Sequence, residues 1–134
     1  MQKRAGILFI SLETHRILLI YENSKWTVPT FEISNNIFED GQRLILKYTG
    51  NRGKLLPIEL YLSEDRGFEY GTYICLTEKE FLTTESKTLC WSSLGDLPKG
   101  LHSGLKSTIT NPLIKAKIDT VLIISKDYRE PTNQ

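Results

Sequence analysis

Hydrophobic residues form short runs along most of the chain, separated by polar segments of a few residues. Residues 5–11 and 16–21 are two such runs joined by the polar segment 12–15, which predicts a β-hairpin near the start of the chain. Residues 25–29 predict a short extended piece, because Pro29 biases the residue before it away from helical conformation. Beyond this point the pattern changes to helical spacing.

Residues 36–50 carry the clearest helical pattern in the chain. Asn36 can cap the N-terminus, and Glu39 stands three residues later in the capping-box position. Gly50 suits the left-handed conformation that ends many helices. The residues that recur at the spacing of one helix face are Ile37, Phe38, Gly41, Leu44, Ile45 and Tyr48.

The second half of the chain predicts more strands and then a second helix. We expect strands at residues 54–63, 68–76 and 87–91, a turn at 64–67 and a loop at 92–102.

The C-terminal part begins with a helical pattern at residues 104–118, in which Pro112 either kinks the helix or splits it. The β-branched run 120–125 predicts one further strand, and residues 126–134 form a polar tail. Strands flanked by two separate helices fit an α/β sandwich with an extra C-terminal strand. We therefore expect a single domain over residues 1–125.

Length and composition are those of an ordinary globular domain. The 134 residues suffice to bury a core, and 40% hydrophobic and 25% charged residues are globular values. With 17 basic and 16 acidic side chains the net charge is +1, which argues against a dedicated nucleic-acid binder. The apolar opening is too short for a membrane or secretory segment. Cys75 and Cys90 lie in apolar runs, so we expect packed thiols in a cytoplasmic protein.

Four segments, taken in their order along the chain, resemble the Nudix hydrolase family over residues 4–118. The opening hairpin resembles the family's first two strands, and Trp26-Thr-Val-Pro29 resembles the entry to its signature segment, the Nudix box. Residues 43–50 line up with the end of the box helix, and residues 90–105 resemble a late strand, loop and helix start. The resemblance implies a Nudix-type α/β/α sandwich with a mixed sheet, to which this chain would add its C-terminal strand. It also implies hydrolysis of nucleoside diphosphate derivatives that depends on Mg²⁺ or Mn²⁺.

The chain departs from this family at the acidic positions of the box helix. The family pattern ends in Arg-Glu-aliphatic-x-Glu-Glu-x-Gly, and here the three glutamate positions are occupied by Leu44, Lys47 and Tyr48. The family glutamates lie on one helix face and share divalent ions, which prefer hard oxygen ligands. Leu, Lys and Tyr remove three anionic ligands and add a cation that repels a divalent ion. The sequence therefore predicts no metal, and no other cofactor, at this helix.

Other carboxylates could replace the missing ligands. A relocated site for Mg²⁺ or Mn²⁺ would combine Glu32 or Glu39 with Glu64 or Glu69, and Glu39 and Glu64 would be its catalytic pair. The alternative is that Glu39 caps its helix, Asp40 is a solvated charge in the first turn, and Glu64 belongs to a turn. Both interpretations are open at this level.

Arg43 and Lys47 are four residues apart, so they would share one face of the helix. A guanidinium is well suited to phosphate, and the pair could bind a phosphate group without metal. Alternatively, Arg43 pairs with Glu39 and the two cations belong to a solvated face. An apolar Leu44 fits either a filled pocket or a partner surface. The candidate ligand-binding residues are Glu32, Arg43, Leu44, Lys47 and Tyr48.

These patterns predict a Nudix-type domain that has lost metal-dependent pyrophosphohydrolase activity and binds a protein partner or a nucleotide-like ligand. A partner or a second copy would dock through the extra strand at 120–125 and the tail, because an exposed sheet edge can pair with another chain. The alternative is a divergent hydrolase that cleaves a nucleoside diphosphate linked to another group. A structural role in a larger assembly, such as a virus particle in an infected cell, is compatible with the binding function.

Overall fold

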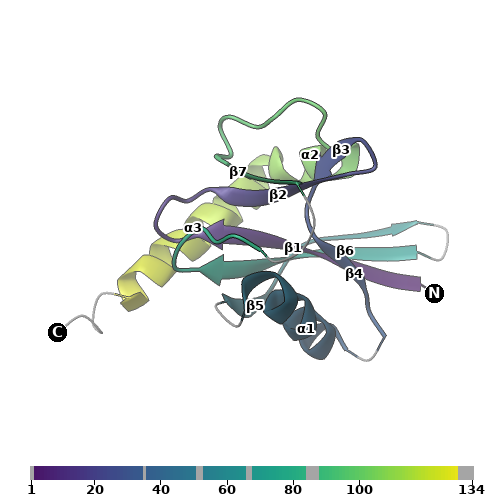
Figure 1. Cartoon of the computed structure of the whole chain (residues 1–134), viewed down its shortest axis with the longest axis horizontal. Coiled ribbons are helices and arrows are strands. Elements are labelled where there is room, and N and C mark those ends of the chain that lie inside the picture. Colours follow the sequence, from purple (N-terminus) through teal and green to yellow (C-terminus); the bar gives the residue numbers. More distant parts are fainter. Residues whose placement is uncertain (1, 35, 51–52, 66–67, 84–87, 130–134) are drawn as a thin grey trace.

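The computed structural model describes residues 2–34, 36–50, 53–65, 68–83 and 88–129, and the side chains of these except at residues 2, 53–69 and 126–129. Within these ranges the chain forms seven strands and three helices (Figure 1). The strands are β1 (Gln2–Ser11), β2 (Ile17–Glu22), β3 (Lys25–Thr27), β4 (Thr30–Glu32), β5 (Gly53–Asp65), β6 (Phe68–Thr77) and β7 (Thr88–Ser92). The helices are α1 (Ile37–Thr49), α2 (Ser103–Ile109) and α3 (Pro112–Arg129).

The strands form one mixed sheet in the order β3-β2-β1-β6-β5, with β4 paired to β1 and β7 paired to β2. β1 runs parallel to β6 over its whole length. On its other edge β1 pairs antiparallel with β4 and then with β2. β5 pairs antiparallel with β6, and its register shifts between Leu56 and Tyr61, around Pro57, which cannot donate to a ladder. The predicted mixed sheet is confirmed.

Helices cover both faces of the sheet, and each face has its own core (Figure 1). Successive side chains of a strand point to opposite faces, so Leu8 and Ile10 of β1 face α2 and α3. Ile7 and Phe9 of the same strand face α1. The predicted α/β/α sandwich is therefore confirmed.

The strand predicted at residues 120–125 is wrong, because this segment lies within α3. Four buried residues of α3 recur at helical spacing and pack against the sheet. They are Ile114 and Ile118, which precede the segment, and Val121 and Leu122 within it. The tail predicted at 126–134 begins within α3, and residues 130–134 lie outside the described residues. Of the helices in the described ranges, none is long and apolar enough to cross a bilayer.

Pro112 splits the second predicted helix rather than kinking it. α2 ends at Ile109 and α3 begins at Pro112. The first position of a helix tolerates proline, because the N–H that proline lacks would have no partner within the helix. Asn111 caps α3, since its side-chain oxygen accepts a hydrogen bond from the Leu113 N–H at 2.9 Å.

The predicted helix at 36–50 is confirmed in its bounds and in both of its caps. The Asn36 side chain accepts a hydrogen bond from the Glu39 N–H at 2.8 Å. Gly50 has φ 63° and ψ 37°, the left-handed conformation that glycine adopts without strain, and its N–H donates to Leu46 O.

Smaller differences concern the turns. The hairpin at 12–15 is confirmed by the pairing of Ile10 with Ile17. Of the turn predicted at 64–67, Glu64 and Asp65 belong to β5 instead, and residues 66–67 lie outside the described residues. The short strand β4 was not predicted. It pairs Thr30–Glu32 with Arg4–Gly6 of β1 and leads the chain toward α1.

The two cysteines are free thiols in different surroundings. Cys75 is fully buried, and burial raises the pKa of its thiol to about 12, whereas Cys90 is half-buried. The thiolate is the form that reacts, and at neutral pH it is scarce at Cys75. We expect iodoacetamide to modify Cys90 in the native protein and Cys75 only after unfolding. Timed labelling with mass spectrometry checks this, and equal native rates at both sites would contradict it.

Glu80 binds two side chains of the turn between β1 and β2. Arg16 donates to its carboxylate through Nε and Nη2, and Thr14 donates through Oγ1, each at 2.6 Å. The hydrogen bond from Arg16 lowers the pKa of Glu80, partial burial opposes this, and the hydrogen bond from Thr14 adds to the lowering. Because the folded pKa is depressed, the stabilisation is present above the ordinary carboxyl pKa and is lost as pH falls through the folded value.

We therefore expect the stability difference between the wild type and Glu80→Gln to be largest near neutral pH and to shrink between about pH 5 and pH 3. Urea unfolding of both proteins across this range measures the difference. A difference that grows on acidification would contradict the assigned direction of the pKa shift.

Candidate functional site

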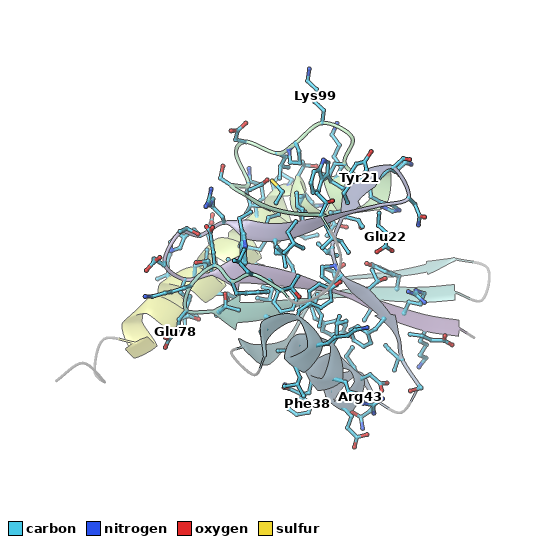
Figure 2. The ribbon with its side chains drawn as sticks, in the orientation of Figure 1. Tyr21, Glu22, Phe38, Arg43, Glu78 and Lys99 are labelled. Carbon is cyan, nitrogen blue, oxygen red and sulfur yellow. The ribbon has the colours of Figure 1, made fainter. Side chains whose placement is uncertain are left out.

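An open groove of about 250 Å³ lies between α1 and the segment that leads into it from β4. One wall comes from β4 and the linking residues, and the other from one face of α1. The lining residues are Phe31, Glu32, Ser34, Asp40, Arg43, Leu44 and Lys47. We call this the α1 groove. Figure 2 shows the Arg43 side chain projecting from α1, at the middle of the helix sequence.

Asp40 ties the two walls of the α1 groove together. It lies in the first turn of α1 and is 6% exposed. Its carboxylate accepts hydrogen bonds from the Ser34 N–H at 2.8 Å and from the Ser34 hydroxyl at 3.3 Å. The expectation that Asp40 is a solvated charge is therefore wrong. A buried carboxylate needs such donors, and the chain just before the helix supplies them.

Arg43 contacts the same carboxylate, with Nη2 3.6 Å from Asp40 Oδ1. The predicted pairing of Arg43 with Glu39 is wrong, since Arg43 pairs with Asp40, three residues before it, instead. The Arg43 side chain is 68% exposed, so its guanidinium lies at the rim of the groove rather than beneath it.

Four of the five predicted ligand-binding residues meet in this groove: Glu32, Arg43, Leu44 and Lys47. Tyr48 lies elsewhere. It is 4% exposed and belongs to the core between α1 and the sheet, where its ring centroid lies 6.0 Å from that of Phe9. Phe31, Ser34 and Asp40 were not among the predicted ligand-binding residues, because nothing in the sequence indicates that β4 runs beside the helix that follows it.

The carboxylates proposed for a relocated metal site are dispersed as far as the structure describes them. Glu39 is exposed and does not line the α1 groove. Glu64 and Glu69 are paired across β5 and β6, but their side chains lie outside the described residues. Among the side chains that are described, no three or more His, Cys, Asp or Glu residues cluster so as to hold a metal ion. The relocated site remains an untested prediction.

The residues of the α1 groove do not fit a divalent metal. Mg²⁺ requires oxygen ligands in near-octahedral arrangement. Of the two carboxylates in the described lining, that of Asp40 is held by Ser34 and Arg43. Arg43 and Lys47 add two positive charges to the same small space. This donor set suits a ligand with an anionic end and an apolar body, since Phe31 and Leu44 supply apolar surface.

Solved structures of Nudix hydrolases have the same fold. A hydrolase of the NUDIX family from Clostridium perfringens is 16% identical and matches with a TM-score of 0.65, covering 89% of this chain and 97% of that chain. An ADP-ribose pyrophosphatase from Streptococcus suis is 16% identical, with a TM-score of 0.63 and coverage of 84% and 87%. An Ap4A hydrolase from C. elegans is 13% identical, with a TM-score of 0.59 and coverage of 93% and 99%.

No protein-family model matches the sequence, and no curated protein matches it. The likeness to the solved structures therefore rests on the arrangement of helices and strands. It establishes the fold of this chain as that of Nudix hydrolases.

Proposed function

We propose that this Nudix-fold domain is a binding module that has lost metal-dependent pyrophosphohydrolase activity, and that its ligand is nucleotide-like. The observation that carries the proposal is the lining of the α1 groove. Leu44 and Lys47, which stand where the family resemblance implies glutamates, both face this groove. The chain thus has a concave site on the helix that the resemblance assigns to catalysis, with an apolar and a cationic side chain at two of the positions implied for metal ligands.

Electrostatics supports the binding function over the metal-dependent one. Two unit charges 4 Å apart near a protein surface interact by about 4 kcal/mol, and a divalent ion doubles this. The Lys47 ammonium would therefore oppose a metal in the groove, and Leu44 offers no ligand in exchange. The same ammonium attracts a phosphate group. The substitution of Lys47 for a family glutamate would therefore account both for the loss of a metal and for direct contact with a phosphate.

A protein partner is the other form of the binding hypothesis, and the C-terminal strand through which it was expected to dock is not formed. Docking by addition to a C-terminal strand needs a free strand edge, and residues 112–129 are helical instead. The concave α1 groove favours a small ligand.

The test is an assay of hydrolysis with ADP-ribose and Ap4A, the molecules named for two of the structural neighbours, in the presence of Mg²⁺ or Mn²⁺. We expect no product above background at a protein concentration equal to that of the substrate. Turnover would support the divergent hydrolase instead. In that case Glu39→Gln and Glu64→Gln should abolish turnover if these two residues form the relocated catalytic pair.

A further inference from the structure

The two walls of the α1 groove differ in chemistry. The α1 wall presents Arg43 and Lys47, and the opposite wall presents Phe31 and Glu32 of β4. Inorganic phosphate would match the cations but would be repelled by the Glu32 carboxylate. A ligand with a phosphate at one end and hydroxyl or amino donors elsewhere would match both walls.

The α1 wall is suited to a phosphate group. Residues four apart on a helix are neighbours, with Cβ atoms about 5–6 Å apart, so one phosphate can contact both Arg43 and Lys47. A guanidinium carries five N–H donors in a planar fork that matches phosphate oxygens. The ion pair with Asp40 involves Nη2 of Arg43, and Asp40 is itself fixed by Ser34. Asp40 is therefore a positioning residue that orients the guanidinium at the rim.

The β4 wall is suited to the rest of a nucleotide. Phe31 is half-buried and lines the groove together with Leu44, which gives a surface on which a base can pack. Glu32 is exposed beside it, and a carboxylate accepts hydrogen bonds from ribose hydroxyl groups, as in dinucleotide sites. A volume of about 250 Å³ is slightly below the usual lower limit of about 300 Å³ for ligand pockets. It suits one nucleotide unit rather than two.

We infer that the α1 groove binds a nucleoside monophosphate without metal, its phosphate held directly by Arg43 and Lys47 and its nucleoside held by Phe31, Leu44 and Glu32. This inference rests on the proposed function, because a metal-dependent hydrolase would use the same helix differently.

Isothermal titration calorimetry of the full chain with AMP, adenosine and inorganic phosphate, in EDTA and low salt, tests the inference. We expect AMP to bind at least tenfold more tightly than adenosine or phosphate. Arg43→Gln and Lys47→Gln should each weaken AMP binding about tenfold. Glu32→Gln should weaken AMP binding and leave phosphate binding unchanged or improved. The matched control is Lys99→Gln, since Lys99 is exposed on the loop before α2, far from α1 in Figure 2.

Two results would overturn the inference. One is AMP binding that is no tighter than phosphate binding, and the other is an equal loss in Lys99→Gln, which would indicate a general attraction of anions. Thermal unfolding of each variant excludes a loss of fold, and Lys47→Gln tests the cation pair even if Arg43→Gln is unstable. Hydrolysis of ADP-ribose would refute the proposed function itself. Absence of both hydrolysis and AMP binding would refute the inference alone.

Discussion

Replacing Tyr48 with glutamate is expected to lower the free energy of unfolding by about 4 kcal/mol or more, because a carboxylate would enter a closed core. Tyr48 is 4% exposed and packs against Phe9 between α1 and the sheet. This is one of the positions where the Nudix resemblance implies an acid. Whole domains of this size are stable by about 5–15 kcal/mol, so the variant should be close to unfolding.

Urea unfolding followed by circular dichroism measures this loss. Tyr48→Phe keeps the ring and should remain folded, and Lys47→Glu places the same acid on the exposed neighbouring position. The second control should change stability by about 0.5 kcal/mol or less. A Tyr48→Glu protein as stable as Lys47→Glu would mean that this face of α1 can still open toward solvent and hold an acid.

The second large effect is expected for Phe9→Ala, which should cost about 3–5 kcal/mol. Phe9 is fully buried near the C-terminal end of β1 and lies between two aromatic rings from other parts of the chain. Its centroid is 5.4 Å from that of Phe81 in an edge-to-face arrangement and 6.0 Å from that of Tyr48. Truncation leaves a cavity that neighbours on a rigid sheet cannot fill.

The control for Phe9→Ala is Leu82→Ala, since Leu82 is 93% exposed and its loss should change stability by about 0.5 kcal/mol or less. Phe81 also stacks edge-to-face on Trp91 at 5.3 Å, so the fluorescence of Trp91 reports on this cluster. A native-like emission spectrum together with a loss of less than about 1 kcal/mol in Phe9→Ala would show that the cluster does not support the fold.

The sequence predicted those elements whose caps, turns and apolar spacing all lie within one short segment. The helix at 36–50 has its cap at Asn36 and its stop at Gly50 within one segment, and both were confirmed. Of its predicted apolar face, Ile45 and Tyr48 are buried, whereas Phe38 is 54% exposed. The opening hairpin is equally local. The sandwich was predicted because the expected strands are flanked by two separate helices, and the structure shows β1 apolar on both faces, one under α1 and the other under α2 and α3.

The C-terminal helix could not be predicted in this way. Residues 120–125 are rich in β-branched side chains, whose weak preference for strands is overridden when packing rewards a helix. Ile118, Val121 and Leu122 share one face that covers Leu8 and Ile10 of the sheet. The helical spacing of the apolar residues is visible only when Val121 and Leu122 are read together with Ile114 and Ile118, which follow Pro112.

The sequence predicted the α1 wall of the candidate site but not the path of the chain that forms the opposite wall. The spacing of Arg43 and Lys47 places both on one helix face from sequence alone. The opposite wall depends on β4 pairing with Arg4–Gly6 of β1, which brings Phe31 beside α1. The burial of Asp40 depends on Ser34, six residues earlier, turning back onto the helix. Such contacts follow from the path of the chain and not from residue type.

Paramagnetic broadening by Mn²⁺ in ¹H–¹⁵N spectra of the full chain, recorded with and without ADP-ribose, tests most directly whether α1 binds a divalent metal. We predict that the amide signals of Leu44, Lys47 and Tyr48 broaden no more than those of other surface amides under either condition. Selective broadening of these three signals at low Mn²⁺, reversed by excess Mg²⁺, would contradict the conclusion that this groove works without metal.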